Sequence, residues 1–332
     1  MEIRPNDRRL AWEGAISVEH EGEWSQAWRV PHLERGLYPQ ALVERAEMPA
    51  GVRLAFRTDS TTVAGVVESQ AEAAPLDLYV DGEWIGSAPL VGSDHFRFEG
   101  IDAHGPKRER TFELWLPQFG PFRLRSLELS DGATLTRHKD ERKRWVTYGS
   151  SITQCRTAAS PSQTWPGVVA RGHDLHLTCL GYGGQCHLDS MIARMMRDRA
   201  AEYLSMCVGI NIYGANSLSE RSFGPGIIGF VRIVREKHPE TPFVVMSPIF
   251  SPPREEVQNK VGFTLQGMRE EVRAAVEALR AAGDKHVHYV NGLEVFGADL
   301  GHLLPDELHP GAEGYKVMGK NFLERVAKRY FT

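Results

Sequence analysis

The sequence predicts an α/β protein with two domains: an all-β sandwich over residues 1–140 and a three-layer α/β/α domain over residues 141–332. The first part carries short runs of alternating apolar and polar residues separated by Gly, Pro and Asp, which is typical of antiparallel sheets. The second part alternates five apolar strands with amphipathic helices, the pattern of a parallel sheet covered on both faces. A length of 332 residues also favours two domains over one.

The strands of the predicted sandwich are recognised by their two-residue period. In the stretch 51–68, apolar residues alternate with charged or small ones. Residues 76–86 predict a hairpin, because two strand-like runs flank the turn-forming pair Asp81–Gly82. The same alternation occurs over residues 95–101, 110–117 and 122–132. We expect no helix of useful length in this part of the chain.

The parallel sheet is predicted from residue 145 onward. Its expected strands are 145–150, 175–181, 203–211, 242–250 and 286–292. The helices expected to alternate with them are 166–173, 188–200, 225–239, 265–283 and 310–330. Pro166 lies in the first turn of its helix, where a missing N–H costs nothing. The mixed-charge run 136–145 is interpreted as a solvated connector between the domains.

Charge and hydropathy exclude several classes of function. The formal net charge is −4 and no basic stripe occurs, so we expect no nucleic-acid partner. No stretch approaches the roughly 18 apolar residues of a membrane helix, so we expect no membrane partner. The first residues are too polar for a signal peptide, and the chain is therefore expected to be cytoplasmic. The oligomeric state is left open.

The cysteines predict no metal centre. Four occur, and none forms a Cys-x-x-Cys pair, so a zinc site has little support. We interpret them as small buried hydrophobic residues in a reducing compartment, with a disulfide or a reactive thiol as the alternative. These residues are Cys155, Cys179, Cys186 and Cys207. No metal ion and no organic cofactor is expected.

Polar and glycine residues follow four of the predicted parallel strands. Ser151 follows the first strand, a cluster of glycines follows the second, and Asn211 lies at the carboxyl end of the third. Asp306 and His309 come after the last strand and a further loop. Because the carboxyl ends of parallel strands meet at one edge of the sheet, we expect these residues to lie together.

These residue types supply every role of acyl transfer through a serine. A serine hydroxyl is a weak nucleophile until a base such as His309 accepts its proton. Asp306 lies three residues earlier and is close enough to hold the imidazole in one tautomer. A backbone N–H in the glycine turn and the side-chain amide of Asn211 are suitable donors to the oxyanion of the tetrahedral intermediate. Each signal alone is weak, and the prediction rests on their conjunction.

The four segments together resemble the sequence blocks of the SGNH, or GDSL-type, hydrolase superfamily. The first block is similar to "GSSI", which implies that Ser151 is the nucleophile, with Ser150 in place of the usual Asp. The last block, Asp-x-x-His, is matched by "DELH", which implies catalytic roles for Asp306 and His309. The resemblance covers roughly residues 144 to 332. It implies a flavodoxin-like three-layer fold for this domain.

The two middle blocks imply the remaining oxyanion donors. The second block resembles "CLGYGG" and implies that Gly184 contributes its backbone N–H, with Gly183 as the rival alignment. The third resembles "GINI" and implies an oxyanion role for Asn211, although Ile212 replaces an Asp. The implied oxyanion hole therefore consists of the backbone N–H groups of Ser151 and Gly184 and the amide of Asn211.

The N-terminal part carries a second resemblance. The stretch "PLDLYVDG" is similar to the Gly-x-Asp-Leu-Tyr segment of a β-sandwich module that precedes some SGNH domains, with Pro75 in place of the Gly. The match lies at Asp77, Leu78 and Tyr79 and implies a jelly-roll-like sandwich. Proteins of this layout include carbohydrate acylesterases, and related proteins are acyltransferases.

We therefore expect a serine esterase that removes a short acyl group, with acetyl as the first choice, from a hydroxylated small molecule such as a sugar. Two alternatives stay open. The first is an acyltransferase that uses the same acyl-enzyme with an alcohol acceptor. The second is a carbohydrate-binding protein whose hydrolase domain is vestigial.

Overall fold

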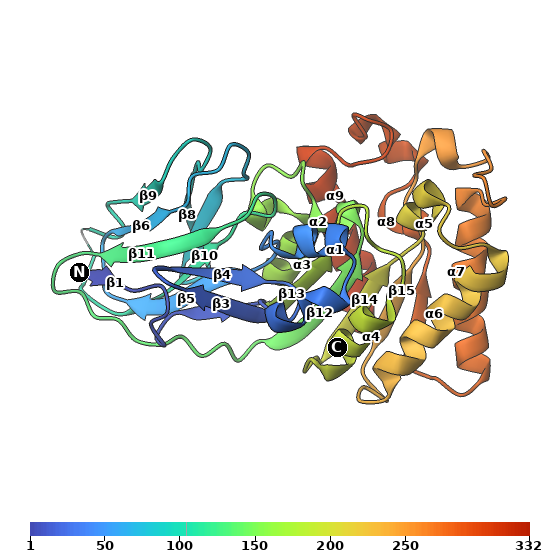
Figure 1. Ribbon diagram of the computed structural model, residues 1–332, viewed down its shortest axis with the longest axis horizontal. Helices are drawn as coiled ribbons and strands as arrows, with labels where there is room; N and C mark the ends of the chain where they lie inside the picture. The colour runs from blue at the N-terminus through green and yellow to red at the C-terminus, as the bar shows by residue number, and fades with distance from the viewer. Residues whose placement is uncertain (104) are drawn as a thin grey trace. The chain divides into compact units, whose positions relative to one another are not determined.

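The computed structural model describes residues 1–103 and 105–332, and the chain divides into two compact units (Figure 1). The first, which we call the sandwich unit, contains Met1–Glu141 together with Ala159–Gln163 and His176–Cys179. The second, which we call the α/β unit, contains Arg142–Ala158, Thr164–Leu175 and Leu180–Thr332.

The sandwich unit contains two antiparallel sheets. One has the strand order β3-β4-β11-β6-β9, with β1 also paired to β11. Its strands are β1 (Glu2–Ile3), β3 (Ser17–Glu21), β4 (Trp24–Trp28), β6 (Val63–Val67), β9 (His95–Phe98) and β11 (Arg123–Leu129). The other sheet has the order β2-β5-β10-β7-β8. Its strands are β2 (Ala11–Glu13), β5 (Arg53–Thr58), β7 (Leu76–Val80), β8 (Glu83–Ala88) and β10 (Arg110–Trp115).

The core of this unit follows from the alternation in the strands. Phe56 on β5 and Phe112 on β10 are register partners, fully buried, with stacked rings 5.6 Å apart. The hairpin turn between β7 and β8 lies at Asp81–Gly82, where both residues have positive φ, as a two-residue turn of this kind requires. The prediction of an all-β sandwich is confirmed.

One helical segment in this unit was not predicted. Helix α1 (Gln40–Ala46) follows a 3₁₀ turn, His32–Leu37, and buries Leu42, Val43 and Ala46. Its seven residues make about two turns, which is too short for a helical period to be distinct in the sequence. The prediction of no useful helix over residues 1–140 was therefore wrong at this one segment.

The α/β unit is built on a five-stranded parallel sheet of order β13-β12-β14-β15-β16, of which residues 176–179 of β13 belong to the sandwich unit as defined above. Its strands are β12 (Lys143–Gly149), β13 (Leu175–Gly181), β14 (Tyr203–Cys207), β15 (Phe243–Met246) and β16 (Val287–Val290). The chain starts in the second position, moves one strand outward, and then continues in the opposite direction, which is the flavodoxin-like order. The predicted fold class is confirmed.

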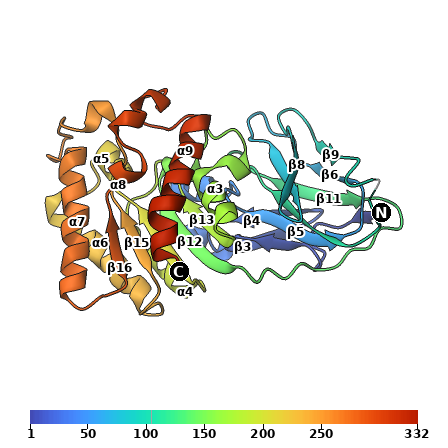
Figure 2. The ribbon, with the colours of Figure 1, turned by 180° about the vertical axis from the view of Figure 1, so that it is seen from behind.

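Helices cover both faces of this sheet. On one face α3 (Trp165–Gly172) packs against α9 (Ala312–Phe322), as Figure 2 shows from behind. On the other, α6 (Glu220–Arg235) packs between α4 (Ser190–Asp198) and α7 (Leu265–Ala281) (Figure 1). A π-helical turn, Leu323–Ala327, and α10 (Lys328–Tyr330) continue the last helix. Among the described helices, none combines the length and the apolar character that crossing a membrane requires.

The N-terminal residues of α3 show why this helix starts where the sequence predicted. Thr164 caps the helix by accepting a hydrogen bond at its hydroxyl from the N–H of Gly167. Pro166 occupies the first turn, as expected.

Candidate active site

The turn after β12 is shaped by a glycine and two serines. A side chain at Gly149 would collide with Thr153, so the chain can turn here only without a Cβ. Ser150 is buried and caps the short helix α2 (Ser151–Gln154) by accepting a hydrogen bond from the N–H of Ile152. Ser151 is the first residue of α2, and its backbone N–H has no acceptor among the described residues.

Ser151, His309 and Asp306 form one hydrogen-bonded chain. The Oγ of Ser151 lies 2.8 Å from Nε2 of His309, and Nδ1 of His309 lies 2.7 Å from Oδ2 of Asp306. The backbone N–H groups of Leu308 and His309 both donate to Oδ1 of Asp306. With Nδ1–H donating to the carboxylate, Nε2 is left to accept the proton of the serine hydroxyl.

The carboxyl group of Asp306 is held in its charged form. Partial burial acts to raise its pKa, but hydrogen bonds from the His309 ring and backbone outweigh this effect and lower the pKa below its ordinary value. An Asp306 carboxylate that is charged at neutral pH can therefore stabilise a positively charged imidazole beside it.

Asn211 lies in the first turn of a short helix, α5 (Ile210–Ala215), because the strand predicted over residues 203–211 ends at Cys207. Its Oδ1 accepts a hydrogen bond of 3.0 Å from the N–H of Cys186, so the amide is fixed with its oxygen directed to that backbone group. Gly209 precedes the helix with a φ of 128°, which only glycine adopts readily. The Nδ2 group of Asn211 remains as the donor.

The loop after β13 distinguishes Gly183 from Gly184. The N–H of Gly183 donates to Oε1 of Gln154 at 2.8 Å. The N–H of Gly184 has no acceptor among the described residues, and Gly184 adopts a φ of 73°. Of the two rival glycines, the geometry leaves the N–H of Gly184 available for a ligand. The sequence did not single out Gln154, because one amide at the end of a four-residue helix carries no pattern.

All four cysteines are buried, as the sequence interpretation expected, and they are free thiols. Burial raises the pKa of the Cys186 thiol far above its ordinary value and that of Cys207 to about 12. Thiolate chemistry at neutral pH is thereby disfavoured at these two residues.

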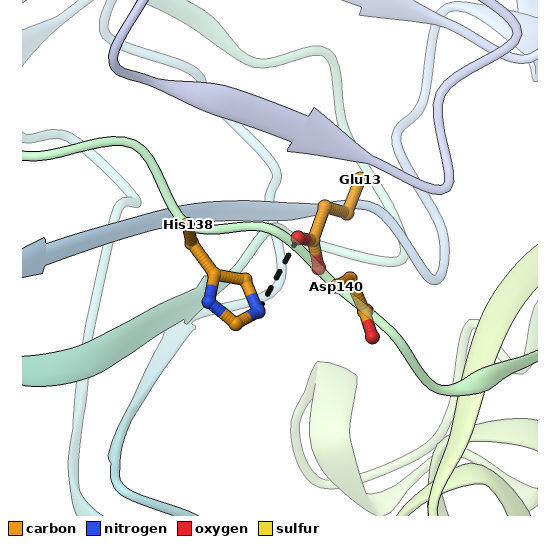
Figure 3. Close-up of side chains that lie close together, drawn as sticks. All are labelled: Glu13, His138 and Asp140. Atoms are coloured by element: carbon orange, nitrogen blue, oxygen red, sulfur yellow. Dashed lines mark ion pairs between the residues drawn. The ribbon is translucent and has the colours of Figure 1, made fainter.

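A separate group of possible metal ligands lies in the sandwich unit (Figure 3). One ligand atom from each of Glu13, His138 and Asp140 lies within 4.8 Å of the others. The fully buried guanidinium of Arg53 lies 3.4 Å from Glu13 and 3.7 Å from Asp140. Arg53 therefore supplies positive charge to this carboxylate pair. No pattern in the sequence predicted the group.

The strand order and the Ser–His–Asp arrangement together are those of an SGNH-type hydrolase domain. The chain belongs to the GDSL-like lipase/acylhydrolase family, whose sequence model matches residues 142–326. Residues 10–125 match the family described as "SsfX3, N-terminal domain". The resemblance noted from the sequence blocks is confirmed at the level of the family.

Solved structures of similar proteins cover nearly the whole chain. Salicylyl-acyltransferase SsfX3 from a tetracycline biosynthetic pathway is 34% identical, with a TM-score of 0.90 over 99% of this chain and 97% of that chain. A protein described as a GDSL-like lipase from Bacteroides ovatus is 22% identical, with a TM-score of 0.78 over 99% and 97%. A family two carbohydrate esterase from Clostridium thermocellum is 11% identical, with a TM-score of 0.67 over 96% and 98%. No curated protein matches the chain.

Proposed function

We propose that the protein transfers the acyl group of an ester to water through an acyl-enzyme on Ser151. The observation that carries this proposal is the continuous hydrogen-bonded chain from Ser151 through His309 to Asp306. The 2.8 Å between Ser151 Oγ and His309 Nε2 is the distance of a nucleophile and a base in direct contact, and the 2.7 Å between His309 Nδ1 and Asp306 is that of a base held by a carboxylate. The class of reaction is also that of the family to which the chain belongs.

Each residue has a defined role in the proposed reaction. His309 accepts the hydroxyl proton while Ser151 attacks the ester carbonyl, and Asp306 stabilises the imidazolium that forms. The N–H groups of Ser151 and Gly184 and the amide of Asn211 donate to the oxyanion. His309 then protonates the leaving alcohol, and a water molecule releases the acyl group through the same base.

A small apolar cavity lies among the chain neighbours of the site residues, and on this ground we propose that the acyl group is short, with acetyl as the first choice. The cavity has a volume of about 10 Å³, room for about one group the size of a water molecule. Three of the residues that line it, Ile152, Ile210 and Leu308, are the chain neighbours of Ser151, Asn211 and His309.

The alcohol half of the ester is proposed to be a sugar or a similar hydroxylated molecule. This proposal rests on the two-domain layout, which carbohydrate acylesterases share. The likeness to the esterase of Clostridium thermocellum is a likeness of fold alone. We expect acetate release from acetylated oligosaccharides. If these bind without turnover, and aryl esters also stay intact, the protein is a carbohydrate-binding protein with a vestigial hydrolase domain.

The first prediction concerns the nucleophile. Ser151→Ala should abolish hydrolysis of p-nitrophenyl acetate and leave the melting temperature close to that of the wild type, because the change removes one oxygen atom. The measurement is the rate of p-nitrophenol release, with circular dichroism as the check on folding. Ser190→Ala is the matched control, because Ser190 is also the first residue of a helix and is exposed. Turnover at the wild-type rate in Ser151→Ala would refute the mechanism.

A second candidate function is acyl transfer to an alcohol. It is favoured by the 34% identity to a salicylyl-acyltransferase, since hydrolase and transferase differ only in which acceptor reaches the acyl-enzyme. Incubation with an acyl donor and a panel of hydroxylated acceptors, followed by mass spectrometry, separates the two. We expect the free acid as the main product; an acylated acceptor in excess over the acid would assign a transferase.

A further inference from the structure

Gln154 connects the segment that carries Ser151 to the loop that carries Gly184. It is the last residue of α2, three positions after Ser151, and only 3% of its surface is exposed. Its Oε1 accepts the N–H of Gly183 at 2.8 Å. A buried amide cannot exchange this bond for water without cost, so the contact is persistent.

The glycine loop is attached to its surroundings through nearly every backbone N–H. Tyr182 donates to the carbonyl oxygen of Gly149 at 2.8 Å, and Gln185 donates to the carbonyl oxygen of Tyr182 at 3.0 Å. Gly183 donates to Gln154. In the described loop from residue 182 to residue 185, the N–H of Gly184 alone has no acceptor.

The attachment by Gln154 acts at the most adaptable point of this loop. Gly183 and Gly184 are consecutive glycines, and a glycine pair has more backbone conformations available than any other pair of residues. The peptide plane that carries the Gly184 N–H begins at Gly183. Fixing the N–H of Gly183 therefore limits the directions in which the N–H of Gly184 can point.

Close packing keeps Gln154 itself in place. A side chain at Gly181 would overlap the backbone of Thr153 and Gln154, so the strand end lies directly against α2. Gln154 is thus held by its helix on one side and by the glycine strand end on the other.

We propose that Gln154 is a positioning residue of the oxyanion hole. By holding the N–H of Gly183, it fixes the direction of the Gly184 N–H and prevents Gly183 from presenting a competing donor. This inference rests on the proposed function, because an oxyanion hole has a role only if Ser151 forms an acyl-enzyme.

The test replaces the acceptor while keeping the volume of the side chain. For Gln154→Met we expect kcat for p-nitrophenyl acetate to fall about 10²-fold with little change in KM, because a misplaced donor weakens binding of the transition state and not of the substrate. Gln154→Glu keeps an acceptor oxygen and should retain more activity than Gln154→Met. Gln266→Met makes the same change at an exposed position of α7 and should behave as wild type.

Active-site titration separates positioning from loss of structure. A phosphonate ester that labels Ser151 counts the folded sites, and kcat is then expressed per labelled site. A low kcat at an unchanged number of sites supports the inference. A kcat per site for Gln154→Met within about twofold of wild type would overturn it, as would a loss fully explained by fewer labelled sites.

The activity of Ser151→Ala distinguishes a failure of the proposed function from a failure of the proposed role of Gln154. If that variant is inactive and Gln154→Met is unimpaired, the proposed function stands and the role of Gln154 falls. If Ser151→Ala retains activity, the proposed function falls first, and the role of Gln154 falls with it.

Discussion

At the scale of the residue, the charge of Asp306 is decided by two opposing effects. Burial disfavours the carboxylate, whereas three donors, the His309 ring and the N–H groups of Leu308 and His309, favour it. The hydrogen bonds together outweigh the effect of burial, and the pKa of Asp306 lies below its ordinary value of 3.8. Protonation of Asp306 should therefore cause no loss of activity above about pH 4.

Replacing this carboxylate tests its role directly. Asp306→Asn keeps the shape of the side chain but removes the charge, and an amide can no longer stabilise the imidazolium of His309 as strongly. We expect kcat to fall about 10⁴-fold, less completely than in Ser151→Ala. Glu307→Gln, at the next position, removes a charge outside the hydrogen-bonded chain and serves as the control. Steady-state kinetics that show equal losses for both variants would contradict the assignment.

At the scale of the element, the short helices were the least predictable part of the chain. Helix α2 has four residues and α5 has six, so neither shows a helical period in the sequence. Both begin directly after a parallel strand, and both carry a site residue in their first turn. The sequence predicted the position of Ser151 and Asn211 at the strand ends, but the turn of helix at each place depends on caps such as Ser150.

The long elements were predictable because their patterns repeat. The five parallel strands are short apolar runs at regular spacing, and α6 and α7 have 16 and 17 residues, enough for several turns. In the sandwich unit, α1 was missed, and so were strands β1 to β4, which fall before residue 51 and carry weaker alternation than the later strands. Strand β3, for example, has no buried residue.

At the scale of the whole molecule, the sandwich unit contains a buried charge cluster in addition to the candidate site of the α/β unit. Glu13, Glu113 and Asp140 surround the guanidinium of Arg53, at distances of 3.4 to 3.7 Å. Burial raises the pKa of Glu13 to about 8, against the lowering effect of Arg53. The folded protein therefore binds a proton that the unfolded chain releases near pH 4.5.

This difference makes stability depend on pH. A raised pKa in the folded state contributes stability that is fully present below about pH 4.5 and is lost as the pH rises toward about 8. We expect the urea midpoint of the full chain to fall between pH 5 and pH 8, and to fall less in Glu13→Gln. Glu83→Gln, at an exposed position of β8, is the control and should follow the wild type. An unchanged slope in Glu13→Gln would show that another group binds the proton.

The sequence by itself determined the fold class and the order of the five parallel strands and the long helices between them, because these follow from periodicity. It also predicted the candidate site residues from their places at the strand ends. Only the tertiary structure decided which hydrogen-bond donors remain available. Gly183 and Gly184 are adjacent and alike in the sequence, and the N–H of Gly183 is occupied because the side chain of Gln154 reaches it. The Glu13 cluster likewise depends on contacts between residues distant in the chain, and no local pattern encodes such contacts.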